Sequence, residues 1–202
     1  LITGRRSPIA WDTDNTQVDF YDMKGILERF LTAIGVQKYT VERGEHFAMH
    51  PGKTALFKKG RDVIAVLGEI HPTVAANFGI AQSVYVFEME VDTLLRYRKK
   101  KSTIAALPKY PASTRDLALL VDAGLTTAEI ERVIAKKGGK FFRSATLFDV
   151  YTGKQVARGK KSMAFHLHFQ SDDKTLTDEE VDAAFADILE AVQSQLHAGL
   201  RA

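Results

Sequence analysis

The sequence predicts an α+β protein in which two modules are joined by a basic linker. In residues 108–202, the strand and helix patterns follow one another in the order βαββαβ. That order is typical of a ferredoxin-like sandwich, with both helices on one face of an antiparallel sheet and the other face open. Residues 1–95 show the signals of a mixed, mainly antiparallel α+β module. Residues 96–107 separate the two modules.

Composition limits the class of protein. Of 202 residues, 45% are hydrophobic and 26% are charged, as in soluble globular proteins. Cysteine is absent, which excludes disulfides, thiolate metal sites and a cysteine nucleophile, and fits the cytoplasm. No apolar run approaches the roughly 20 residues of a membrane span, so no membrane partner is expected. The chain starts at Leu1, so we expect a fragment of something longer.

The elements of the first module follow from helix caps and turn residues. A broad apolar face at helical spacing predicts a helix that begins at Asp19 and ends at Gly35. Gly60 lies between two apolar runs and predicts a β-hairpin. The other expected elements are an extended piece at 7–11, a strand at 36–42, the hairpin strands at 54–57 and 63–70, a helix at 73–78 and a strand at 83–91.

The linker and the second module are marked by prolines and capping boxes. Residues 96–101 hold five basic residues in six, so this stretch is either a solvated linker or a contact for RNA phosphates. A strand is expected at 115–122. Thr126 and Glu129 form a capping box that opens a helix, and Thr177 and Glu180 open a second one. Residues 199–201 are expected to form a short final strand.

Two strands at 145–151 and 162–169 carry the candidate site. Strict alternation places Phe148 and Val150 over the core with the row Met163, Phe165, Leu167 and Phe169. It places Ala145 and Leu147 on the open face of the sheet. The polar residues expected on that open face are Asp149, Tyr151, Ser162, His166 and His168.

The connection at 152–161 is a basic loop beside this face. It contains two glycines, no acidic residue and four cations: Lys154, Arg158, Lys160 and Lys161. Such a loop suits an anionic ligand with flat rings, and we expect these cations to contact phosphates. An ordinary solvated loop is the alternative interpretation.

The open face has the chemistry to bind unpaired bases. Tyr151 offers a stacking surface worth roughly 1–3 kcal/mol per base. Asp149 can accept a hydrogen bond from a base, and Ser162 can donate or accept one. The aromatic pair of common RNA-recognition modules is missing, because Phe165 and Phe169 belong to the core row. A structural tyrosine at a strand end remains an open alternative.

No catalytic or metal site is predicted. The run from His50 to Thr54 resembles the end of a P-loop, but Phe47 stands where its first glycine belongs. The spacing of His46, His50 and His71 matches no known metal site. No nucleophile with an adjacent base stands out.

Several ordered motifs resemble one protein family. In the second module these are FDVY at 148–151, GKKSMAF at 159–165, TLTDEEV at 175–181 and PASTRDL at 111–117. They resemble the ferredoxin-fold anticodon-binding domain that ends the β subunit of bacterial phenylalanyl-tRNA synthetase. The first module is similar to that subunit's catalytic-like part at 18–25, 50–52, 68–72 and 87–88.

This resemblance implies a function. The first module would be the second half of a class II synthetase catalytic-like fold that is inactive and contacts the α subunit. In the second, Asp149, Tyr151 and Ser162 would read the anticodon of phenylalanine tRNA, with His166 beside them on the open face. ATP and magnesium belong to the whole enzyme, expected to be a heterotetramer, and this fragment would bind no cofactor and be inactive alone. We expect the family's amino-terminal modules, including its metal-binding and editing parts, to lie outside this fragment.

Two other functions are compatible with an open ferredoxin-like face. One is a protein-interaction module that docks protein in place of RNA. The other is an amino-acid-sensing domain, since ferredoxin-like sheets often bind amino acids at their edges.

Overall fold

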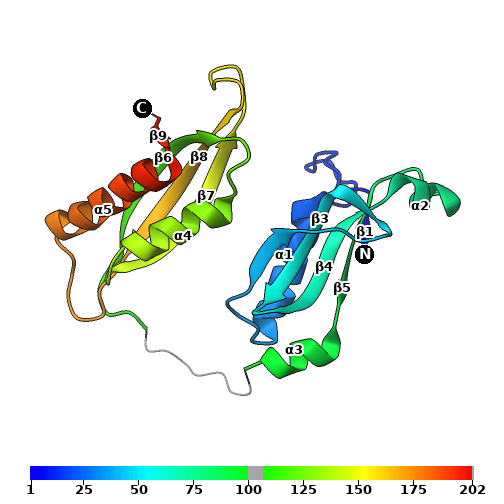
Figure 1. The fold of residues 1–202 in the computed structure, drawn as a ribbon, viewed down its shortest axis with the longest axis horizontal. Helices are drawn as coiled ribbons and strands as arrows, with labels where there is room; N and C mark the ends of the chain where they lie inside the picture. Colours follow the sequence, from blue (N-terminus) through cyan, green and yellow to red (C-terminus); the bar gives the residue numbers. More distant parts are fainter. Residues whose placement is uncertain (100–106, 202) are drawn as a thin grey trace. The chain divides into compact units, whose positions relative to one another are not determined.

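A computed structural model describes residues 1–99 and 107–201 of the chain. The chain divides into two compact units, Leu1–Ile104 and Ala105–Ala202 (Figure 1). Each unit has its own antiparallel sheet and its own hydrophobic core. The predicted linker, residues 96–107, lies mostly outside the described residues. In the described part of the chain, no helix has both the length and the apolar character needed to cross a membrane.

The first unit is a five-stranded antiparallel sheet in the order β1-β5-β4-β3-β2. Its strands are β1 (Ile2–Thr3), β2 (Thr40–Arg43), β3 (Met49–Lys59), β4 (Asp62–Ile70) and β5 (Val84–Met89). Its helices are α1 (Phe20–Ala33), α2 (Pro72–Asn77) and α3 (Val91–Tyr97). Helix α1 packs against one face of this sheet, and its Met23, Leu27 and Leu31 are buried there (Figure 1).

Local chemistry explains most boundaries in this unit. Asp19 caps α1 in a reciprocal capping box with Asp22, and Gly35 ends the helix at a φ of 79° that glycine adopts without strain. Gly60, at a φ of 63°, makes the turn between β3 and β4 as predicted. The sheet confirms the predicted hairpin and its core, with Phe57 and Leu67 fully buried.

The structure corrects three predictions in this unit: the extended piece at 7–11 is wrong, and the strands predicted at 36–42 and 83–91 form with other bounds. Residues 7–11 form bends and a turn, because Thr13 hydrogen-bonds back to the carbonyls of Pro8 and Ala10 and folds the segment into a loop. Strand β2 begins at Thr40, since Gly35 and Lys38, both at positive φ, keep the chain turning before it. Residues 91–97 are helical, so Val91 leaves the strand and is 58% exposed.

The second unit is the predicted ferredoxin-like sandwich. Its elements are β6 (Ser113–Asp122), α4 (Thr127–Lys137), β7 (Phe142–Tyr151), β8 (Lys160–Phe169), α5 (Asp178–Leu196) and β9 (Gly199–Leu200). The sheet order is β7-β8-β6-β9, and every pair is antiparallel. Helices α4 and α5 cover one face of this sheet (Figure 1). The α+β class and the βαββαβ order are confirmed.

Side-chain hydrogen bonds set where both helices begin and tie the start of α5 to the sheet. Both predicted capping boxes form, with Thr126 and Thr177 each accepting a hydrogen bond from the amide three residues on. Arg115 of β6 donates hydrogen bonds to Asp178 and Asp182 at the start of α5, each over 2.8 Å. The core between the layers is apolar, and Phe165 and Phe169 are completely buried in it. Among the described residues of this unit, both helices lie on one face of the sheet and none lies on the other.

Candidate nucleic-acid interface

The open face of the second unit is built from β6, β8 and β7. On β8, Met163, Phe165, Leu167 and Phe169 are buried beneath the helices, so Ser162, Ala164, His166 and His168 point to the other side. The register places Tyr151 opposite Ser162 and Asp149 opposite Ala164. Paired residues share a face, so Asp149 and Tyr151 lie on the open face beside Ser162.

A β-bulge at Phe148 corrects the predicted alternation of β7. Leu147 pairs with Phe165, and the next pair is Asp149 with Ala164. Strand β7 therefore advances by two residues where β8 advances by one. Before the bulge the odd residues Ala145 and Leu147 pack against the core, not on the open face as predicted. After it, odd residues face outward. Asp149 and Tyr151 lie on the open face because Phe148 stands outside the pairing; if Phe148 were a regular member of the ladder, they would face the helices.

Phe148 itself was wrongly predicted to belong to the core. Its side chain is 50% exposed, and its ring stacks on the ring of His166 with centroids 3.9 Å apart and planes 13° from parallel. His166 belongs to the open face, so Phe148 lies there too. The Nδ1 atom of His166 is 2.6 Å from the Oδ1 atom of Asp116 on β6. Alternation gave no signal for this stack, because nothing in the local pattern marks the bulge.

Val150 was also predicted to lie over the core. It does face the helical side of the sheet, since it pairs with Met163, but it is 49% exposed. The strand ends of β7 and β8 extend past the two helices, so this position has the predicted facing without the predicted burial (Figure 1).

Tyr151 is held between two neighbours. A side-chain carbon at Gly153 would come within 2.1 Å of the tyrosine hydroxyl oxygen, so this glycine lies directly against the ring. The guanidinium of Arg201, which follows β9, lies 5.1 Å from the ring centroid. Arg201 also donates a hydrogen bond to Gln155 over 3.4 Å. Sequence reasoning missed Arg201, whose place near Tyr151 follows only from the pairing of β9 with β6.

Ser162 lies on the open face but is only 3% exposed. Tyr151 on β7 and Leu120 on β6 are its partners across the two ladders, and they flank it from either side. Asp149, by contrast, is exposed. The face therefore presents an exposed carboxylate beside a half-buried tyrosine, with the serine hydroxyl beneath.

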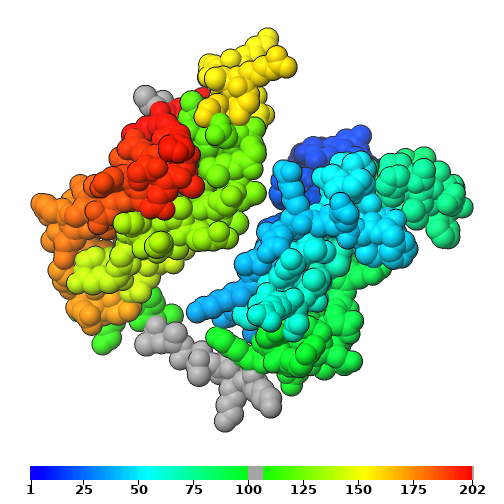
Figure 2. Space-filling view, viewed as in Figure 1, coloured from blue at the N-terminus to red at the C-terminus, as the bar shows by residue number. Residues whose placement is uncertain are grey.

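The basic residues of the 152–161 segment do not form one group. Figure 2 shows the connection between β7 and β8, in yellow, projecting from the surface of the second unit. Lys154 and Arg158 are exposed on it. Lys160 pairs with Asp122 over 2.7 Å at the end of the ladder.

Lys161 lies on the opposite side of the sheet from the open face. Its partner in the ladder is Val121, which is buried under the helices. Hydrogen bonds from Thr126 hold the pKa of Glu129 on α4 below its usual value, and the charge of Lys161 lowers that pKa further. Lys161 is therefore directed to the helical layer.

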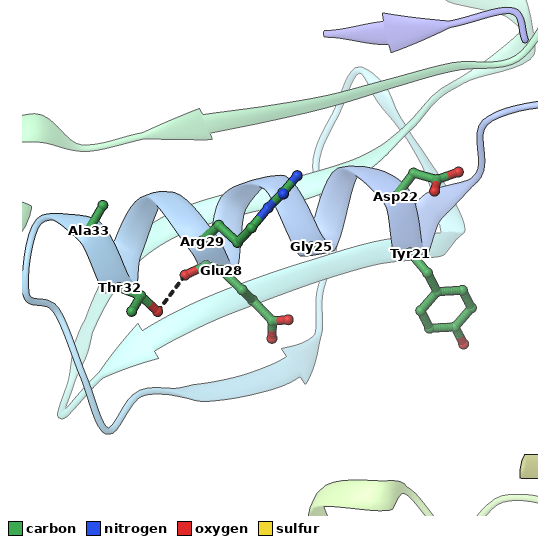
Figure 3. A pocket seen from close by; sticks show the side chains of 7 residues that line it. All are labelled: Tyr21, Asp22, Gly25, Glu28, Arg29, Thr32 and Ala33. Atoms are coloured by element: carbon green, nitrogen blue, oxygen red, sulfur yellow. Dashed lines mark hydrogen bonds between the residues drawn. The ribbon is translucent and has the colours of Figure 1, made fainter. Parts of the chain in front are cut away.

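Other concave or titratable positions lie in the first unit. A shallow hollow of about 630 Å³ runs along the outer side of α1, lined by Tyr21, Glu28 and Arg29 among others, and Thr32 donates to the Glu28 carbonyl there (Figure 3). The rings of His50 and His71 stack with centroids 6.2 Å apart. Within residues 1–99 and 107–201, no three His, Asp or Glu side chains gather closely enough to hold a metal ion.

Both units match known domain families. Residues 108–201 match the ferredoxin-fold anticodon binding domain. Residues 1–91 match the phenylalanyl tRNA synthetase beta chain CLM domain. The fold and the open face thus define a synthetase subunit that carries an anticodon-binding domain.

Curated relatives agree along the whole chain. It is 38% identical over 203 residues to the phenylalanine–tRNA ligase β subunit of Syntrophotalea carbinolica, with 100% of this chain and 25% of that protein aligned. It is 39% identical over 203 residues to the β subunit of Listeria monocytogenes, again with 100% and 25% aligned. For Clostridium acetobutylicum the identity is 40% over 185 residues, covering 91% of this chain and 23% of that subunit. The chain belongs to the phenylalanine–tRNA ligase β-subunit family and spans about a quarter of its curated relatives' length.

Proposed function

We propose that this chain is a non-catalytic portion of a phenylalanine–tRNA ligase that binds the anticodon region of phenylalanine tRNA. The observation that carries the proposal is the convergence of Asp149, Tyr151 and Ser162 on one uncovered sheet face, within residues that match an anticodon-binding domain. Tyr151 stacks one base, and Asp149 accepts a hydrogen bond from a base edge. Ser162 supplies a hydroxyl once the ring above it shifts.

The projecting connection positions the RNA without reading its sequence. Lys154 and Arg158 are exposed there and Lys160 lies at its base, so these three cations contact phosphates in the proposal. Lys161 faces the helices and is left out of this group. For a single strand, three phosphate contacts correspond to a slope of about −2 in a plot of log affinity against log salt concentration.

The first unit serves in the proposal as the contact for the synthetase α subunit. Four aromatic side chains described in this unit are strongly exposed: Trp11 at 98%, Phe47 at 94%, Phe78 at 76% and Tyr21 at 74%. Aromatic residues are enriched at protein–protein interfaces, and in the proposal the α subunit covers these groups. ATP and magnesium then act on the α subunit of a cytoplasmic heterotetramer, and this chain alone performs no aminoacylation.

The experiment that tests the proposal is binding of the chain to phenylalanine tRNA and to the same tRNA with an altered anticodon, in a salt series. We expect weaker binding at high salt for both tRNAs and weaker binding of the altered one at every salt concentration. Tyr151→Ala and Asp149→Ala should remove the difference between the two tRNAs. Val150→Ala, on the other face of the same strand, should leave it intact.

Three results would contradict base reading by this face. Equal binding of the two tRNAs means that the chain only holds the RNA backbone. Unchanged affinity in the Tyr151→Ala and Asp149→Ala double variant points to a protein-docking face. Thermal stabilisation by phenylalanine, with none by tRNA, points to an amino-acid-sensing domain.

A further inference from the structure

The bulge residue Phe148 and the histidine beneath it form a second aromatic surface on the open face. We propose that Phe148, stacked on His166, holds an unpaired nucleotide different from the one stacked on Tyr151. This inference rests on the proposed function, since it assigns a second base-binding position to the same face. Phe148 is a base-contacting residue in this proposal, and Asp116 and His166 are positioning residues.

The stack is built from three strands, which fixes its orientation. The Phe148 ring lies parallel to the His166 ring at 3.9 Å, so one of its two faces is covered. His166 is held by Asp116 of β6, with 2.6 Å between Nδ1 and Oδ1. The side chain of Phe148 is 50% exposed. A base that stacks on the outer face of Phe148 would extend an ordered stack of rings. Because the Phe148 ring is already held in place, binding would cost little side-chain conformational entropy.

The fold itself does not need a phenylalanine at this position. The ladder is continuous from Leu147 paired with Phe165 to Asp149 paired with Ala164, and Phe148 has no partner on β8. Single exposed apolar side chains are common on protein surfaces. This ring differs because it stacks on His166 and is half exposed, so its outer face is open to a flat ligand. Bulges recur where a strand redirects a side chain toward a ligand. Stacking of a base would cover this ring.

The two aromatic surfaces are too far apart to hold the same base. Tyr151 lies opposite Ser162, while Phe148 lies over His166, four residues further along β8. At the usual rise of a strand, four residues span about 13 Å. Asp149 stands between them on the same face. A single-stranded loop that crosses β7 and β8 would therefore place one base on each ring.

The test uses an anticodon stem-loop RNA with 2-aminopurine at one loop position at a time, bound to the full chain. Stacking on an aromatic ring quenches this base, so each position reports its own contact. We expect two quenched positions in the wild type. Phe148→Ala should release one of them and weaken binding by about 5- to 150-fold, the range for loss of one stacked base. Tyr151→Ala should release the other.

Two further variants separate stacking from folding. Phe148→Tyr keeps the ring and should restore both quenching and affinity. Val150→Ala removes a side chain of the same exposure, 49%, from the opposite face of β7 and should have no effect on binding. Melting temperatures of all variants should stay close to the wild type, since both positions are half exposed.

The outcomes distinguish this inference from the proposed function. If Tyr151→Ala abolishes anticodon preference while Phe148→Ala behaves like Val150→Ala, the anticodon-binding function stands and the second surface is refuted. If both variants release the same probe, there is one binding position and the inference is again refuted. If the wild type shows no anticodon preference, the proposed function fails and this inference falls with it.

Discussion

Gly153 is the residue that limits where the Tyr151 ring can lie. An alanine side chain there would approach the tyrosine hydroxyl oxygen to 2.1 Å, well inside contact distance. The obstructed atom is the far end of a side chain, so the ring can swing away without breaking the sheet. The position of Tyr151 therefore depends on the absence of a side chain two residues later.

We predict that Gly153→Ala weakens anticodon discrimination at least fivefold, the lower end of the effect of one stacked base. The melting temperature should change little. The measurements are affinities for the two tRNAs and the NMR signals of the Tyr151 ring. Gly124→Ala is the matched control, because its new side chain would have open space around it. Full discrimination together with shifted Tyr151 signals would show that the ring position is unimportant.

At the scale of elements, Glu69 joins the central strands of the first unit. Its side chain, 9% exposed on β4, accepts hydrogen bonds from Lys53 of β3 and, over 3.0 Å, from Ser83 just before β5. Burial on its own would raise the pKa of Glu69, but these hydrogen bonds and the lysine charge outweigh it and lower the pKa. The ionised carboxylate is thus the form that the folded sheet favours.

We predict that Glu69→Gln lowers the stability of the first unit at pH 7 by about 1.5–3 kcal/mol, the usual size for hydrogen bonds to a charged group. The folded pKa lies below the unfolded value near 4.3, so the stabilisation is complete above that value. It is lost as pH falls through the folded pKa, and the two proteins should then converge. Urea unfolding followed by the Leu67 methyl NMR signals measures this. Glu88→Gln, an exposed carboxylate, serves as control.

Strand β7 shows why alternation predicts some side chains and not others. The row of β8 was predicted correctly because that strand pairs with β6 in an unbroken register from Lys160 to Phe169. On β7 the register shifts, and strict period-two counting reversed Leu147 and Phe148. Asp149 and Tyr151 were placed correctly because they follow the bulge together with Val150, whose facing was also predicted correctly. A bulge depends on pairing with another strand, which a local pattern does not contain.

Caps were the most informative local signals, and their absence explains a missed helix. The capping boxes at Thr126 and Thr177 predicted α4 and α5. Helix α3 has Glu90 at its N-cap, with no side-chain hydrogen bond to the helix. Its seven residues are stabilised by tertiary burial of Leu94, which no short sequence window reveals.

At the scale of the whole molecule, the two cores share no buried residue. Phe57 belongs to the first core and Phe165 to the second, and both are completely buried. We predict that Phe165→Ala destabilises the second unit by about 3–5 kcal/mol and leaves unfolding of the first unchanged. Phe57→Ala should do the reverse. Methyl NMR signals of Leu67 and Leu167 during urea unfolding report each unit, and parallel shifts of both signals would contradict independent folding.

The sequence predicts the secondary structure and the cores better than it predicts the side-chain contacts on the open face. The order of elements in the second unit and the main strands and helix of the first follow from periodicity and caps, since these depend on neighbours in the chain, whereas β1 and α3 were missed. The contacts of Tyr151 with Arg201 and of Phe148 with His166 join residues 50 and 18 positions apart in sequence. Such contacts depend on sheet order, so only the folded structure reveals them.

The β-bulge at Phe148 also affects which single-residue deletions the fold tolerates. Because Phe148 has no partner on β8, losing one codon near it would leave a regular ladder, and the residues on either side would keep their faces. Strand β8 has no unpaired residue along its ten pairs with β6. Losing a codon there would exchange its buried and exposed rows on one side of the deletion. For the fold alone, a single-codon deletion should therefore cost less stability at Phe148 than within β8, whatever it costs in RNA binding.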